Sequence, residues 1–435
     1  MREPYSLDHF EWDVTGGIAV PGAYGGTDFS NRGERGIERQ VEENRRRGLT
    51  RPPTVETTDG FLYLNAGLWG QIGNLGITAT ADLLRYDVTP ANPANPPLAL
   101  SLVRFHLVGA YGFLRNQLCV GAGVRMAYVN GNEVNAADGP VISMFGVAPQ
   151  AGLIVKPEDT QFRVGLTARA PVSATPFTSL GSLISEEQTD GTTIRRAGTD
   201  FILPRQIVQP WELELGVAYQ LGPRPLNPRW IDPIAHRRER QLVVYERRKD
   251  RHEQQRAEIA ALPGDSAVDR VHRAARIAEI AREETALRAQ EEAELKDADA
   301  RLEEERKARY LNWPREHVLL LACVLATGAS EEAVALEGFI DQRRELVGSR
   351  VTVAPRFAVE SEPVPNRLKT RAGVYFEPSR FADGSIRQHF TLGVDVRLFQ
   401  WSVFELFPGR QWRLTAFFDV AERYQNFGFS AGTWY

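Results

Sequence analysis

Charged side chains at alternate positions are the residues of this chain that are best suited to bind another molecule. They occur in runs where apolar residues alternate with polar or small ones, so the charged residues lie on the face opposite the apolar face. The basic members are Arg104, Arg125, Arg163, Arg169, Arg356, Lys369, Arg371, Arg397 and Arg413. The acidic members are Glu212, Glu214, Glu360, Glu377, Asp395 and Asp419.

Two interpretations of these charges stay open. In the first, the charges neutralise one another inside a water-filled barrel and bind nothing else. In the second, one or two arginines bind the carboxylate of an amphipathic ligand, because a guanidinium group offers two parallel donors to a carboxylate. The ligand-binding candidates are Arg125, Arg163, Arg169 and Arg371.

No recognisable motif for catalysis or cofactor binding points to a function other than binding by the charged faces. The sequence has no nucleophile elbow, no metal-ligand spacing and no phosphate-binding loop. Of its seven histidines, His106 and His389 fall on the charged faces, without a serine at a recognisable spacing. Cys119 and Cys323 fall in separate expected strands, which indicates neither a disulfide nor a metal site. We therefore expect no enzymatic activity, no metal and no cofactor.

The charge balance and the hydropathy pattern exclude two classes of protein. Lysine and arginine number 52 against 56 aspartate and glutamate, a net charge of −4, so nucleic acid is not an expected partner. No run of about 18 apolar residues occurs, which excludes a transmembrane helix but leaves a membrane-spanning barrel open.

Alternating runs recur about fourteen times, most sharply in residues 210–221, and residues 387–398 illustrate the two faces. One face there holds Phe390, Leu392, Val394, Val396 and Leu398, and the other holds His389, Thr391, Gly393, Asp395 and Arg397. The expected strands are 10–20, 61–69, 75–84, 101–111, 118–128, 145–155, 162–170, 211–221, 319–326, 351–360, 368–377, 390–398, 412–420 and 427–435.

The number and spacing of these strands favour a transmembrane antiparallel β-barrel over a soluble sheet. Short turns alternate with long polar loops such as 21–60 and 173–206. In a membrane barrel the apolar face meets lipid and the polar face meets the lumen. An even strand count places both chain ends on the short-turn side, as in single-chain outer-membrane barrels.

A different composition separates the eighth strand from the ninth. Residues 236–310 are rich in Arg, Glu, Ala, Lys and Gln, which predicts two long helices. They are broken at 262–266, where Asp265 or Ser266 can cap the second helix. We expect a barrel from 1–235 and 311–435, with a helical hairpin at 236–310 on the periplasmic side. The hairpin is either solvated or a docking arm for a periplasmic protein.

Three segments resemble the FadL family, the long-chain fatty acid transporters of bacterial outer membranes. They are PQAGLIVKPEDTQFRVGLTARAPV (149–172), LPRQIVQPWELELGVAYQLGP (203–223) and NRLKTRAGVYFEPSRF (366–381). The resemblance implies a fourteen-stranded barrel whose lumen is closed by an N-terminal plug. It also implies an apolar ligand that enters from outside and leaves sideways through a kinked strand.

The chain departs from the family pattern at two places. About nine residues precede the first strand, without the Asn-Pro-Ala segment of the family's plug, and the insertion at 236–310 is foreign to the best-known members. Residues 1–14 also lack a basic region followed by an apolar one, so we expect no secretory signal within this chain.

Three hypotheses follow for the function. The main one is an outer-membrane barrel, in contact with membrane lipid, that transports long-chain fatty acids or other hydrophobic small molecules by passive binding and diffusion. The alternative is a structural or adhesive barrel whose helical insertion binds a periplasmic partner. The third is a soluble β-sandwich with a coiled-coil arm.

Overall fold

A computed structural model describes most of the chain and divides it into two compact units. The described residues are 11–21, 62–72, 74–88, 98–133, 142–174, 184–187, 193–197, 201–203, 207–229, 233–264, 266–330, 347–381, 384–400, 411–422 and 424–434. One unit contains Glu11–Pro228 and Pro314–Tyr435, and the other contains Arg229–Trp313. The predictions for residues 1–10 and for the loop at 22–60 lie outside the described residues.

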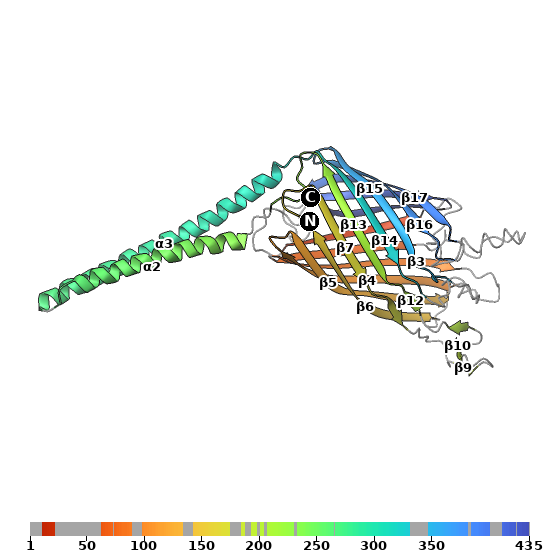
Figure 1. Ribbon diagram of the computed structural model, residues 1–435, viewed down its shortest axis with the longest axis horizontal. Helices are drawn as coiled ribbons and strands as arrows, with labels where there is room; N and C mark the ends of the chain where they lie inside the picture. The colour runs from red at the N-terminus through yellow and green to blue at the C-terminus, as the bar shows by residue number, and fades with distance from the viewer. Residues whose placement is uncertain are drawn as a thin grey trace, which may run out of the picture. The chain divides into compact units, whose positions relative to one another are not determined.

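Fourteen of the described strands form an antiparallel barrel in the first unit (Figure 1). They are β1 (Glu11–Pro21), β2 (Leu62–Ile72), β3 (Leu75–Val88), β4 (Leu98–Phe113), β5 (Leu118–Glu133), β6 (Ile142–Val155), β7 (Phe162–Arg169), β13 (Glu212–Leu221), β14 (Val318–Thr327), β15 (Thr352–Val364), β16 (Leu368–Pro378), β17 (Ile386–Gln400), β18 (Gln411–Ala421) and β19 (Tyr424–Thr433). Consecutive strands pair, and β1 closes the ring because it pairs with both β2 and β19. The strands match the predicted ones.

Five short strands lie in the connection between β7 and β13, most of which was predicted to be a polar loop. β9 (Ile184–Glu187), β10 (Thr193–Ala197) and β11 (Phe201–Leu203) form a three-stranded sheet. β8 (Val172–Ala174) pairs with β12 (Ile207–Gln209) to form a two-stranded ribbon. The prediction missed these strands because each is only three to five residues long.

The two ends of the barrel differ in their connections. Turns between β2 and β3, β4 and β5, β6 and β7, and β15 and β16 share one end, which we call the short-turn end. The chain also leaves β13 and returns to β14 at this end. The predicted alternation is not strict, since the tight turn from Ala421 to Tyr424 lies at the opposite end.

The apolar face of each strand points outward. On β17, Phe390 and Leu392 are 56% and 59% exposed, whereas the neighbouring His389 and Asp395 are 1% and 0% exposed. On β6, Phe145 is outward and exposed while Met144 is buried. In water such a surface would be unfavourable, because exposed apolar area costs about 25 cal/mol per Å² relative to burial. An apolar outer band around a polar interior is the organisation of a barrel that spans a membrane.

The second unit contains two antiparallel helices, α2 (Pro233–Ala261) and α3 (Ala267–Leu311). Ser266 caps α3: its Oγ accepts from the Asp269 backbone N–H at 3.1 Å, and Asp269 accepts from the Ser266 N–H at 3.1 Å. This reciprocal pair satisfies two donors that the first helical turn leaves free. Neither helix, nor any other in the described part of the chain, is long and apolar enough to cross a membrane.

Ion pairs rather than a broad apolar stripe join the two helices. Arg251 contacts Glu284 at 3.1 Å and Glu291 at 2.7 Å, and Arg237 contacts Asp299 at 2.9 Å. Glu284 and Glu291 are both buried, on the same stripe of α3 that buries Leu302. The hairpin therefore depends on arginine and glutamate remaining charged.

An arginine on the apolar band tests the membrane assignment. Leu392→Arg places a charge on the outer face near the middle of β17, and we expect it to lower the free energy of unfolding by up to about 2–4 kcal/mol. Urea unfolding of the barrel in lipid vesicles, followed by gel migration with and without boiling, measures the change.

The matched control for this experiment is Leu242→Arg on α2, where the leucine is 58% exposed, as Leu392 is. A water-facing helix position tolerates arginine, so its effect should stay within about 0.5 kcal/mol. Equal effects of the two variants would contradict the assignment of the outer face to lipid.

Acidification tests the charged helix interface. Burial raises the pKa of Glu284, but hydrogen bonds from Arg251, His252 and Arg288 lower it more, and the pKa falls to about 2. Because the folded carboxylate binds protons less readily than the unfolded one, the hairpin is stabilised above pH 4.5, and this stabilisation is lost as the pH falls towards 2. Helical circular dichroism of the full chain should show the loss, and Glu284→Gln should flatten it. An unchanged profile in the Gln variant would refute the assignment to Glu284.

Candidate binding site in the barrel interior

The charged residues predicted to share a face do point into the barrel. They alternate with the exposed apolar residues along each strand, and most of them pair with one another. Three groups can be distinguished: one near the short-turn end, one on β5, β7 and β13, and one on β16 to β19.

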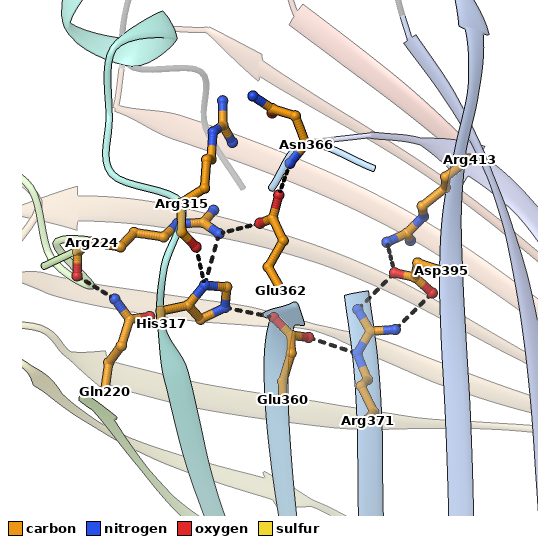
Figure 2. Close-up of polar contacts among 10 residues, drawn as sticks. All are labelled: Gln220, Arg224, Arg315, His317, Glu360, Glu362, Asn366, Arg371, Asp395 and Arg413. Atoms are coloured by element: carbon orange, nitrogen blue, oxygen red, sulfur yellow. Dashed lines mark hydrogen bonds and ion pairs between the residues drawn. The ribbon is translucent and has the colours of Figure 1, made fainter. Parts of the chain in front are cut away.

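The group near the short-turn end centres on Asp395, whose side chain is fully buried. Arg371 binds it in the bidentate geometry, with Nη1 and Nη2 each 2.8 Å from a carboxylate oxygen. Arg371 Nε also donates to Glu360 at 2.6 Å, and Arg413 and Thr415 complete the shell around Asp395 at 3.2 and 2.8 Å. Figure 2 shows this chain of contacts across β15, β16, β17 and β18.

Arg224 extends the same group from the segment that follows β13. Its Nη1 donates to Glu362 at 3.2 Å, and Glu362 also accepts from the Asn366 backbone N–H at 2.5 Å (Figure 2). His317 lies beside them, with Nε2 3.4 Å from Glu360. A buried carboxylate costs several kcal/mol unless it is paired, and Arg224 supplies the partner for Glu362.

The segment 222–228 is hydrogen-bonded to β7 at the short-turn end of the barrel. Asn227 Nδ2 donates to the Phe162 carbonyl at 2.6 Å, while its own Oδ1 accepts from Arg163 Nε at 2.6 Å. Arg163 also donates to the Leu226 carbonyl. The guanidinium of Arg163 therefore holds this segment against β7.

The second group lies on β5, β7 and β13. Arg169 joins Glu212 and Glu214, each at 3.1 Å, and is 22% exposed. Arg125 lies 3.5 Å from Glu212 and is 1% exposed. Its other donors bind the carbonyl oxygens of Ala170 at 2.8 Å and Pro210 at 2.6 Å. Arg125 and Arg169 thus share one carboxylate.

The third group surrounds His389. Its two ring nitrogens lie 3.0 Å from Asp419 and 3.0 Å from Glu377, and its ring stacks on Tyr375 with centroids 4.2 Å apart. Tyr375 donates to Asp419 at 2.8 Å, and Arg387 donates to Glu377 at 2.8 Å. A buried imidazole held between two carboxylates can accept and hold a proton.

The four predicted ligand-binding arginines are placed in different groups. Arg125 and Arg169 come together, whereas Arg163 lies at the short-turn end and Arg371 belongs to the Asp395 group. Each of the four has an internal partner. Their role towards a ligand stays a prediction. The side chains of Arg169 and Arg371 are 22% and 35% exposed, whereas that of Arg125 is 1% exposed.

Sequence reasoning missed Arg224, Asn227 and His317, which flank the helical insertion. Arg224 and Asn227 stand in a proline-rich stretch without alternation, and His317 directly precedes β14, outside the predicted strand 319–326. The alternation therefore assigned none of the three to a face. Among the described residues, no cluster of three or more His, Cys, Asp or Glu side chains is arranged to hold a metal ion.

The geometry defines a membrane-spanning barrel of fourteen antiparallel strands with a charged, internally paired lumen. The sequence matches no protein-family model, and no curated protein matches it. Solved structures with a similar organisation include a FadL homologue from Pseudomonas aeruginosa, at a TM-score of 0.47 and 9% identity, covering 99% of this chain and 91% of that one.

Two further structures are similar over nearly the whole chain. The toluene transporter TodX from Pseudomonas putida has a TM-score of 0.41 and 9% identity, covering 98% of this chain and 89% of its own. CymD, a monoaromatic hydrocarbon channel, has a TM-score of 0.42 and 8% identity, covering 99% and 88%. At these values, no ligand and no residue role carries over to the present chain.

Removing Arg371 tests how much the internal pairing stabilises the barrel. Arg371→Met keeps the aliphatic volume but removes the bidentate partner of the buried Asp395, which keeps its contact with Arg413 at 3.2 Å. Breaking a buried pair costs about 3–5 kcal/mol, and the remaining partners should keep the loss near the lower figure. Arg104→Met is the control, since Arg104 is 36% exposed in its pair with Asp82 and should cost about 0–1 kcal/mol. Similar losses for both variants in urea unfolding would contradict this ranking.

Proposed function

We propose that this protein is an outer-membrane channel that lets long-chain fatty acids or other hydrophobic small molecules pass by passive binding and diffusion. The observation that supports it best is the partial exposure of two paired guanidinium groups on the inner wall. The side chains of Arg169 and Arg371 are 22% and 35% exposed. A ligand with a carboxylate head group and an alkyl chain suits such a site, because a guanidinium group binds a carboxylate through two parallel hydrogen bonds.

The resemblance of three sequence segments to the FadL family supports the same proposal. Two of them, 149–172 and 203–223, include β7 and β13, the strands that carry Arg169, Glu212 and Glu214. Of these three residues, Arg169 has the donors and, at 22% exposure, the accessibility that a carboxylate ligand needs.

Loss of one guanidinium tests the head-group contact. We expect Arg169→Gln to weaken oleate binding about ten-fold, since a hydrogen bond to a charged group contributes about 1.5–3 kcal/mol. Binding of oleyl alcohol, which lacks the carboxylate, should be unchanged. Titration of both ligands in detergent, followed by tryptophan fluorescence, measures this selectivity. An equal effect on acid and alcohol would argue against a carboxylate contact at Arg169.

A second candidate function is a structural or adhesive barrel whose helices bind a periplasmic protein. The helices carry exposed apolar side chains, among them Tyr245 at 64% and Val271 at 67% exposure. Deleting residues 236–310 separates the two proposals. If oleate binding and growth on oleate of cells without their own transporter survive the deletion, the barrel is the working part. If transport is unaffected but the barrel loses a cross-linked periplasmic partner, the helices have the separate role.

A further inference from the structure

A proline ends the pairing between β6 and β7. The last paired residues are Gln150 and Arg169, and beyond them Ala170 N–H donates to the Pro149 carbonyl at 3.0 Å. In a regular antiparallel pair the opposite residue would return this bond. Pro149 has no N–H, so the Ala170 carbonyl lacks its backbone donor and accepts from Arg125 Nε at 2.8 Å instead.

Beyond this point the chain runs along the inside of the barrel. Val172, the first residue of β8, is completely buried and packs against Ala127, Val129 and Met144, on the inward faces of β5 and β6. The inward residue Gly146 leaves room for it, because a Cβ there would lie 2.6 Å from Val172 Cγ1. The ribbon of β8 and β12 therefore starts inside the lumen rather than in the wall.

Arg125 binds both legs of this ribbon. Nε donates to the carbonyl of Ala170, which precedes β8, and Nη2 donates to the carbonyl of Pro210, which follows β12. The side chain is 1% exposed, and Glu212 lies 3.5 Å from Nη1. A charged side chain buried to this degree is costly unless its donors are used, and here they join two segments 40 residues apart in the sequence.

We propose that the ribbon of β8 and β12 is the constriction that limits the size of solutes in this barrel, and that Arg125 is the positioning residue that holds it in the lumen. This inference rests on the proposed function only in that the lumen is a passage. It assigns Arg125 a role in shaping that passage, whether or not a ligand carboxylate also binds nearby.

Two variants release the ribbon by independent routes. Arg125→Met removes the donors to Ala170 and Pro210 and keeps an aliphatic side chain. Gly146→Leu fills the space that Val172 occupies. The control is Gly216→Leu, an inward glycine on β13 whose added Cβ would meet only the Ala322 carbonyl oxygen, at 3.9 Å.

Single-channel conductance in planar bilayers and the entry of sugars of increasing size into vesicles are the measurements. We expect Arg125→Met and Gly146→Leu to raise conductance at least two-fold and to admit larger sugars, while Gly216→Leu behaves as the original protein. Only protein whose gel migration is heat-modifiable is compared, so that each variant is a folded barrel.

A reversible lock compares the held and the released ribbon in one and the same folded protein. Gly146→Cys and Val172→Cys, with Cys119→Ser and Cys323→Ser, place two thiols at the observed contact. Added to Arg125→Met, this pair should restore low conductance when oxidised and high conductance when reduced. Low conductance under both conditions, in protein with a folded barrel, would overturn the proposal.

The outcomes separate this inference from the proposed function. Conductance that is unchanged in both release variants, with oleate binding intact, rejects the constriction and leaves the transport proposal standing. Higher conductance of the two release variants, in a protein that does not bind oleate, supports the constriction and rejects the proposal of a hydrophobic ligand.

Discussion

Pairing of charges inside the barrel is the interaction on which the rest of this structure depends. Each strand has two faces, and the outer face is largely apolar, so most charged residues of the wall lie inside. There a carboxylate such as Asp395, with no exposed surface, is tolerated because Arg371, Arg413 and Thr415 all contact it. The same requirement gives Arg224 and Arg125 their partners, and through them two loop segments are held against the inner wall.

This pairing also shapes what the interior can recognise. Arg125 is 1% exposed and donates to two backbone carbonyl groups, so it holds protein segments in place rather than facing a ligand. Arg169 and Arg371 keep part of their surface open while they are paired, so an incoming carboxylate would exchange one acid partner for another. Such an exchange costs less desolvation than burying a new charge, which is consistent with the channel function proposed above.

The strands, the charged groups of the lumen and the ribbon of β8 and β12 differ in how far the sequence predicts them, because they have different physical origins. The fourteen strands and their faces were predictable because alternation is local: Phe390 and His389 reveal their opposite environments by adjacency. The sequence predicted most of the charged residues that face the lumen, but not which of them contact one another. The strand register, in which Tyr375 pairs with His389 and Thr391 with Asp419, brings together His389, Glu377 and Asp419. Alternation of apolar and polar residues does not determine which register two strands adopt. The ribbon inside the lumen depends on a missing N–H at Pro149 and a long-range arginine, neither of which has a periodic signal.

The two buried glutamates of α3 limit which helices can pair with it. Glu284 and Glu291 stand seven residues apart on the stripe that faces α2. Leucine at these positions would give a more stable helix interface, but one with little specificity for its partner. With acids there, a neighbouring helix must present arginines at matching levels, as Arg248 and Arg251 do. Helices without them would leave two carboxylates unpaired. The hairpin therefore discriminates against amphipathic helices that lack arginines at these two levels.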